Sequence, residues 1–161
     1  MQLWLESSAS GLSLRPAVSA DDAFFQQLFA ATRPYFAQSG LPENLVQQLL
    51  QQQYQLQQQS YQQQKPTTYV LLHHAQPVGR LILARQEDVL HLTDVAFLPN
   101  HCGLGLGSEL MRALQQYVRE QRLVLSLLVA QDNVRAQKFY LNHGFTLVAQ
   151  SESHYQLCWQ I

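Results

Sequence analysis

Hydrophobic and polar positions recur along the chain at spacings that predict strands and helices in turn. Alternating or short continuous apolar runs indicate strands, and apolar residues three and four apart indicate helices. The predicted strands cover residues 12–16, 67–72, 78–84, 89–98, 123–129, 145–148 and 154–159, and the predicted helices cover residues 19–32, 44–64, 108–121 and 133–144. This order predicts a mixed α/β fold in a single domain over residues 1–161, with residues 1–11 as a loose leader.

Some elements carry finer expectations. Ser19 is expected to cap the first helix, whose first turn holds two aspartates. The glutamine-rich stretch 44–64 fits either disordered low-complexity sequence or one or two amphipathic helices, and the helical spacing of its apolar residues favours helices. The run 123–129 is almost continuously apolar, which is typical of a strand covered on both faces. Residues 73–77 predict the turn of a hairpin.

Composition narrows the function. The chain has 161 residues, 47% of them hydrophobic, and a net charge of −1, which argues against a nucleic-acid binder that needs a basic face. Cys102 and Cys158 share no metal-binding or disulfide spacing, so we expect no metal site and a reducing compartment. The sequence shows neither a signal-peptide pattern nor an apolar run of membrane-spanning length. We therefore expect a cytoplasmic protein without a membrane partner.

A glycine-rich turn between a predicted strand and a predicted helix carries the main chemical signal. Gly103, Gly105 and Gly107 allow backbone N–H groups to approach a ligand without hindrance from Cβ atoms. The helix that follows directs its positive end to the same place, so the turn predicts a phosphate site. A plain tight connection is the alternative that one glycine alone would favour.

Two common phosphate-binding motifs do not fit this turn. A nucleoside triphosphate loop ends in Gly-Lys-Ser/Thr, whereas Gly107 is followed directly by Ser108. The dinucleotide motif needs a third glycine where Ser108 stands, and it belongs on the first strand of its domain. A nucleotide-dependent oxidoreductase remains as a weaker alternative.

Two segments resemble signatures of the GNAT acetyltransferase superfamily. Residues 99–107, Pro-Asn-His-Cys-Gly-Leu-Gly-Leu-Gly, resemble its pyrophosphate loop, and residues 133–145 resemble its Asn-x-x-Ala-x-x-x-Tyr-x-x-x-Gly-Phe signature. Residues 14–22 are similar to a common opening of the family. The resemblance implies a mostly antiparallel central sheet, splayed in the middle and flanked by helices. Cys102 departs from the pattern, because that loop position usually holds Arg or Gln.

The resemblance also implies acetyl-CoA as co-substrate and a set of residues that bind it. Tyr140 corresponds to the residue that commonly protonates the departing thiolate; a packed core tyrosine is the alternative. The implied cofactor-binding residues are Val95, Ala96, Phe97, Cys102, Gly103, Leu104, Gly105, Leu106, Gly107, Ser108, Asn133, Ala136 and Tyr140.

Asp94 and His91 are the candidates for a base or an acceptor-orienting group. Three positions apart, they lie on opposite faces of a regular strand, but a bulge would re-aim one of them. For Asp94, a structural hydrogen-bonded carboxylate is the alternative. We expect the first two helices and the last strands, with Phe36, Tyr54 and His154, to line the acceptor site.

The resemblance thus implies an N-acetyltransferase that moves an acetyl group from acetyl-CoA to a primary amine by direct attack. The amine belongs to a small molecule or a protein, and a homodimer is possible. The alternative is a non-catalytic acyl-CoA-binding or interaction domain of the same fold, which Cys102 and the missing obvious base would suit.

Overall fold

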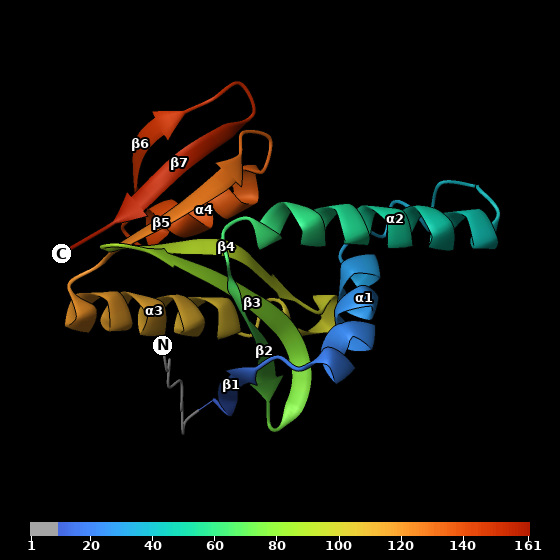
Figure 1. The fold of residues 1–161 in the computed structure, drawn as a ribbon, viewed down its shortest axis with the longest axis horizontal. Coiled ribbons are helices and arrows are strands. Elements are labelled where there is room, and N and C mark those ends of the chain that lie inside the picture. The colour runs from blue at the N-terminus through green and yellow to red at the C-terminus, as the bar shows by residue number, and fades with distance from the viewer. Residues whose placement is uncertain (1–9) are drawn as a thin grey trace.

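The described part of the chain, residues 10–161 of a computed structural model, is built around a single seven-stranded sheet with helices on both faces (Figure 1). Apart from Ser10 and Gly11, the expected leader lies outside the described residues. The elements are β1 (Leu12–Pro16), α1 (Asp22–Ala31), α2 (Glu43–Gln62), β2 (Thr67–His73), β3 (Gln76–Gln86), β4 (Val89–Phe97), α3 (Leu106–Gln121), β5 (Val124–Ala130), α4 (Val134–Asn142), β6 (Thr146–Gln150) and β7 (His154–Trp159). The predicted order of strands and helices is confirmed.

The sheet has the order β1-β2-β3-β4-β5-β7-β6. Every neighbouring pair is antiparallel except β4 and β5, which run parallel. The mixed, mostly antiparallel sheet implied by the resemblance is therefore present. The parallel pair stands in the middle of the sheet, and the functional features described below gather around it.

Alternating side chains of the strands pack into two separate hydrophobic cores, one on each face of the sheet. On β2, Tyr69 and Leu71 enter the larger core, which α3 covers with residues such as Leu110 and Leu114. Val70, between them, packs instead with Phe29 of α1 and other aromatic residues of the second core. Because successive side chains of a strand point to opposite faces, α3 and α4 lie on one face of the sheet and α1 with α2 on the other.

The glutamine-rich stretch is one continuous helix, α2, which extends past the end of α1 (Figure 1). Its buried residues are Val46 and Tyr54, and the hydroxyl of Tyr54 donates to Asp22 of α1 at 2.7 Å. Most of the glutamines thus form the polar outer surface of a helix that is attached through a narrow apolar stripe, while Gln57 faces the sheet and bonds to Arg80.

Some boundaries differ from the prediction. Ser19 does not cap a helix: a short 3₁₀ turn occupies Ser19–Asp21, and α1 begins at Asp22 with Asp21 as its N-cap residue. Asp21 accepts from the backbone N–H of Val18 and from Arg15, and these bonds fix the turn. The hairpin turn is also shorter than predicted, because His74 and Ala75 adopt positive φ and close it in two residues.

The strand at residues 123–129 is covered less completely than its apolar sequence predicts. Leu125, Leu127 and Val129 of β5 are buried in the larger core, but Leu128 is 56% exposed on the opposite face. The reason is that α1 and α2 cover the β2–β3 side of that face and leave the part near β5 uncovered. Among the helices of residues 10–161, none has the length and apolar character needed to cross a bilayer.

Candidate functional site

The parallel strands β4 and β5 separate partway along their length. Their pairing runs from Val89 opposite Val124 to Leu92 opposite Leu127, whereas β4 continues to Phe97 and β5 to Ala130. Over residues 95–97, β4 is paired on its β3 side alone. The edge that faces β5 therefore offers backbone N–H and C=O groups to a ligand that lies between the strands.

A bulge in β4 sets which side chains face the two sides of this split. Asp94 lies opposite Ile82 of β3 and Leu92 lies opposite Leu83, so Thr93 is an extra residue. Before the bulge Leu90 and Leu92 enter the larger core, and after it Val95 and Phe97 do. The bulge thus places Asp94 on the same face as His91, as the sequence analysis allowed.

A cavity of about 400 Å³ lies under the split, between α3 and α4. We call it the α3–α4 cavity. It is mostly apolar, and eight of the thirteen predicted cofactor-binding residues are among those that line it. Its lining consists of Leu92, Val95, Ala96, Phe97, Cys102, Gly107, Leu110, Met111, Leu114, Asn133, Arg135, Ala136, Phe139 and Tyr140.

The glycine-rich turn forms the entrance to α3. Gly103 and Gly105 both have positive φ, +81° and +79°, and a Cβ at either would meet no atom within 4 Å. In the described part of the chain, no backbone or side-chain acceptor bonds the N–H groups from Gly103 to Ser108. Unpaired donors at the positive end of a sixteen-residue helix suit an anion such as a diphosphate.

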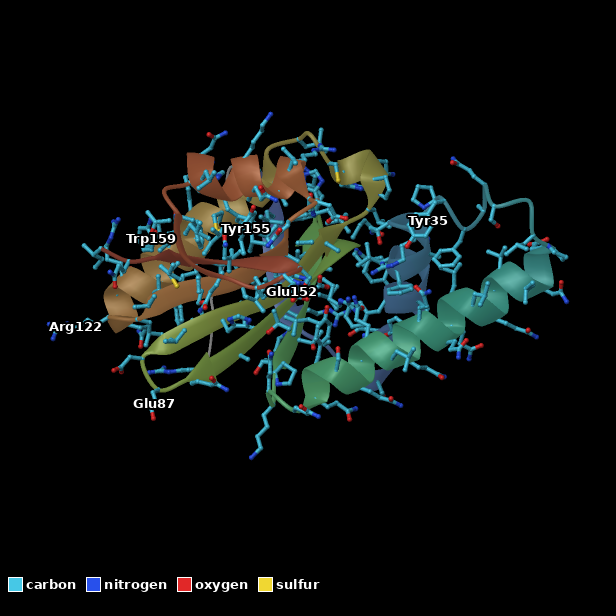
Figure 2. The ribbon with its side chains drawn as sticks, turned by 90° about the horizontal axis from the view of Figure 1, so that it is seen from above. Tyr35, Glu87, Arg122, Glu152, Tyr155 and Trp159 are labelled. Carbon is cyan, nitrogen blue, oxygen red and sulfur yellow. The ribbon has the colours of Figure 1, made fainter. Side chains whose placement is uncertain are left out.

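A second pocket, of about 860 Å³, opens on the other face of the sheet, beside α1. We call it the α1-side pocket. Tyr35, which follows α1, lies on the side of the molecule that carries α1 and α2, and Glu87, Arg122 and Trp159 lie at the other end (Figure 2). The pocket is lined by Leu28, Phe29, Thr32, Arg33, Tyr35, Gln57, Arg80, Asp94, Val95, Ala96, Ala130, Asp132 and Asn133.

Within this pocket Asp94 is ion-paired with Arg80 of the neighbouring strand. Arg80 is only 4% exposed, and its Nη2 and Nε donate to Oδ2 of Asp94 at 2.7 and 3.2 Å. Nη2 also donates to Gln57 of α2 at 3.0 Å. Both bonds to Asp94 use the same oxygen, so Oδ1 is left to accept from a ligand. The structural role that we weighed for Asp94 is present, together with a free acceptor atom.

The two cavities meet at the split. A small cavity of about 170 Å³ lies between the separated strands, and we call it the wedge. Val95 and Asn133 line the α3–α4 cavity, the α1-side pocket and the wedge alike. Tyr140 lines both the α3–α4 cavity and the wedge, and Asp94 lines both the α1-side pocket and the wedge. Ligands that enter from opposite faces of the sheet can therefore touch here.

Tyr140 lies on α4 against the larger core, with its ring 5.4 Å from Phe139 and 5.5 Å from Phe145. Burial, with a smaller contribution from the charge of Asp94, raises the pKa of Tyr140 to about 12. The phenol thus keeps its proton at neutral pH. The helix that carries it begins at Asn133, whose side chain accepts from the backbone N–H of Ala136 at 3.2 Å.

His91 lies outside these three cavities. It lines a separate pocket of about 890 Å³ on the uncovered sheet face, together with Gln64, Ser126 and Gln156. Burial lowers the pKa of His91, so its imidazole is neutral at neutral pH. Its position does not bring it together with Tyr140 and Asp94.

The structure also adds residues that sequence reasoning missed. Arg135 is among the residues that line the α3–α4 cavity, as are Cys102 and Gly107, so the cavity contains a cation although the loop lacks the usual Arg or Gln. Arg33 and Arg80 line the α1-side pocket, and neither is among the residues that the sequence analysis expects at the acceptor site. Phe36, Tyr54 and His154, which we expected there, are not among its lining residues. Residues 10–161 hold no group of metal-ligating side chains that could bind an ion.

Comparisons with known proteins agree with this architecture. The model of the Acetyltransferase (GNAT) family matches residues 25–145. The PaiA N-acetyltransferase of Thermoplasma acidophilum, solved in complex with coenzyme A, is similar with a TM-score of 0.70 and 13% identity over 93% of this chain and 99% of that one. An acetyltransferase from Thermus thermophilus is similar with a TM-score of 0.66 and 20% identity over 92% of this chain and 96% of that one.

A third solved structure is an acetyl transferase from Salmonella typhimurium that modifies the N-terminal serine of the ribosomal protein L7/L12. It gives a TM-score of 0.67 and 17% identity over 96% of this chain and 98% of that one. A comparison with curated protein sequences finds no match. At these identities the solved structures establish a shared fold, and the family model concerns most of the chain.

Proposed function

Because the chain belongs to the GNAT family of acetyltransferases, we propose that it transfers the acetyl group of acetyl-CoA to a primary amine by direct attack on the thioester. The observation that carries the proposal is the meeting of the α3–α4 cavity and the α1-side pocket at Val95 and Asn133. In this proposal the α3–α4 cavity binds the acyl donor, the α1-side pocket binds the acceptor amine, and the wedge connects the two.

The donor would be held by backbone groups and one cation. Its diphosphate would accept from the N–H groups between Gly103 and Ser108, where the open space at the glycines lets phosphate oxygens approach. Its pantetheine arm would pair with the free edge of β4 at residues 95–97, like an added strand. Arg135 would supply the charge that Cys102 does not.

The chemistry needs a proton donor and an uncharged amine. The amine nitrogen bonds to the carbonyl carbon, the carbon–sulfur bond breaks, and the proton lost by the amine passes to solvent. Tyr140 would donate a proton to the departing sulfur, and its phenolate would take up a proton from solvent to restore the phenol. Burial raises the pKa of the phenol to about 12, and the same burial disfavours a free thiolate beside it.

The acceptor would enter through the α1-side pocket, with Oδ1 of Asp94 oriented toward its amine. A lysine-type amine costs about 4–5 kcal/mol to deprotonate at pH 7, whereas an α-amine costs about 1 kcal/mol. A protein amine is a precedent among similar folds, since the Salmonella typhimurium enzyme modifies an N-terminal serine. The reaction would take place in the cytoplasm, where Cys102 and Cys158 stay reduced.

Thiol release from acetyl-CoA, measured with a panel of amines, tests the proposal. We expect release with at least one amine, and a decrease in kcat of about 10²-fold for Tyr140→Phe. Tyr117→Phe, on α3 against the same core, is the matched control and should retain activity. Coenzyme A binding in calorimetry without thiol release across the panel would instead identify a non-catalytic acyl-CoA-binding domain.

A further inference from the structure

The α1-side pocket contains charges of both signs that come from different elements. Arg33 follows α1, which packs against β2, whereas Asp132 follows β5 on the other side of β4 in the sheet. Between them, Arg80 and Asp94 neutralise each other. Residues 10–161 contain only one further ion pair, Arg15 with Asp21, so neither Arg33 nor Asp132 has a counter-ion within this part of the chain.

The guanidinium of Arg33 is held in one orientation by its contacts, with one edge unbonded. Its Nη1 donates to the backbone oxygen of Phe29 at 3.2 Å and to Oγ1 of Thr32 at 3.1 Å. Its guanidinium carbon lies 3.5 Å from the centroid of the Phe29 ring, which fixes the plane of the group. Nε and Nη2 make no hydrogen bond within the described residues, so one edge of the guanidinium remains for a ligand.

The environment of this cation favours an anionic partner. Burial lowers the pKa of Arg33, because the half-buried charge has lost part of its hydration, and the charge of Asp94, which does not form an ion pair with it, offsets this only in part. A carboxylate that bound the free edge would restore a charge-assisted hydrogen bond. An acceptor with additional positive charges in place of a carboxylate would meet like charge at this position.

The amine of the acceptor would lie on the side of the pocket that is next to the split between β4 and β5. The split, marked by Val95 and Asn133, lies beside Asp94 and Asp132, whose carboxylates suit an ammonium group before it loses its proton. Arg80 stands opposite Ala96 on the adjacent strand, so the pocket extends from the split across β3 toward α1. An acceptor that spans it would have its amine at the split and its anion at Arg33.

We propose that the α1-side pocket selects acceptors that carry a carboxylate together with the amine, and that Arg33 is the residue that recognises the carboxylate. The inference rests on the proposed function, since it assigns the substrate class of the same site. Free amino acids and peptides with an acidic residue near the N-terminus share this chemistry.

The test compares each acceptor with its carboxamide. Glycine, β-alanine, γ-aminobutyrate and phenylalanine are assayed against their amides, and peptides with a glutamate near the N-terminus against their glutamine counterparts. The quantity measured is the ratio of kcat/KM for acid over amide, in the wild type and in Arg33→Gln. Comparison of the two ratios cancels the different basicities of the amines.

We expect the acid-to-amide ratio to fall about tenfold or more in Arg33→Gln, as for the loss of a hydrogen bond to a charged group. Arg85→Gln is the control, because Arg85 is an exposed arginine at the far end of β3 and should leave the ratio unchanged. The peptide pairs distinguish a protein substrate from a free amino acid. An equal ratio in the wild type and in Arg33→Gln would overturn the inference.

A binding measurement distinguishes failure of the proposed carboxylate recognition from failure of the proposed function. Saturation-transfer NMR on the protein saturated with CoA follows N-acetylglycine and its amide, together with the N-acetyl derivatives of the other acids. Carboxylate-selective binding that Arg33→Gln abolishes supports the recognition even if no amine is acetylated, in which case the proposed function alone fails. Equal binding of acids and amides overturns the recognition.

Discussion

Arg80 binds Asp94 through one carboxylate oxygen, with Nη2 and Nε at 2.7 and 3.2 Å from Oδ2. The two residues lie on adjacent strands, on the sheet face that α1 and α2 cover. Arg80 is almost fully buried, whereas the side chain of Asp94 is 22% exposed toward the α1-side pocket. The pair therefore fixes the carboxylate that we propose meets the acceptor.

The first prediction concerns the energy of this pair. Asp94→Ala leaves a buried guanidinium without its counter-ion and should lower the free energy of unfolding by about 3 kcal/mol. The double variant Arg80→Met with Asp94→Ala removes the stranded charge and should recover most of that loss. Urea denaturation measures both. A double variant no more stable than the single one would contradict the pairing.

The second prediction separates backbone strain from ligand binding at the glycine-rich turn. Gly105→Ala forces a Cβ onto a residue with φ of +79° and should cost about 1 kcal/mol of stability. It should also weaken acetyl-CoA binding, since the Cβ enters the space proposed for the diphosphate. Gly40→Ala is the control, because Gly40 has a φ of +77° and open space but lies outside the site.

The two glycine variants are compared by thermal unfolding and by calorimetry with acetyl-CoA. We expect the two variants to lose similar amounts of stability. Only Gly105→Ala should have a larger dissociation constant for acetyl-CoA. Equal affinity in both variants would argue against a diphosphate at this turn.

The third prediction concerns Arg135. If its guanidinium supplies the charge that Cys102 lacks, Arg135→Gln should weaken acetyl-CoA binding by about tenfold, the value of one charge-assisted hydrogen bond. The remaining affinity should depend less on salt concentration. Lys138→Gln, on the same helix but not among the residues that line the α3–α4 cavity, should have little effect. An Arg135 variant that binds like the wild type would assign the diphosphate to backbone donors alone.

The fourth prediction concerns acid stability. The Arg15 guanidinium, with the backbone N–H of Val18, lowers the pKa of Asp21 to about 2. A carboxyl group with a lowered folded-state pKa stabilises the protein above its unfolded pKa, near ~3.9, and this contribution is lost as the pH falls toward 2. Asp21→Asn should therefore destabilise the protein at neutral pH and flatten the loss of stability between pH 4 and 2.

Urea denaturation at a series of pH values measures this slope. Asp88→Asn, in the turn between β3 and β4 and outside the ion pairs of the described residues, should leave it unchanged. An unchanged slope in Asp21→Asn would show that other groups govern the acid transition.

Local signals in the sequence predicted most of the fold. The order of elements, including a helix that begins next to Asn133, follows from apolar periodicity. Three glycines between a predicted strand and a predicted helix indicate the glycine-rich turn. Each of these signals is carried by neighbouring residues, so no knowledge of distant contacts was needed.

The charge arrangement of the α1-side pocket depends on contacts between distant residues. Arg80 lies within an apolar predicted strand, and nothing near it in the sequence indicates Asp94 on the next strand as its partner. Arg33 follows α1 and reaches the pocket only because α1 packs across β2 and β3. A single arginine inside an otherwise apolar run is the signal that could have indicated a buried ion pair.

The separation of β4 from β5 has a consequence for the protein without its co-substrate. Residues 95–97 then have backbone N–H and C=O groups that no strand pairs on the side of β5. In the proposed complex the pantetheine arm satisfies these groups with hydrogen bonds. Saturation with acetyl-CoA would then raise the melting temperature of the protein, in addition to supplying the acetyl group.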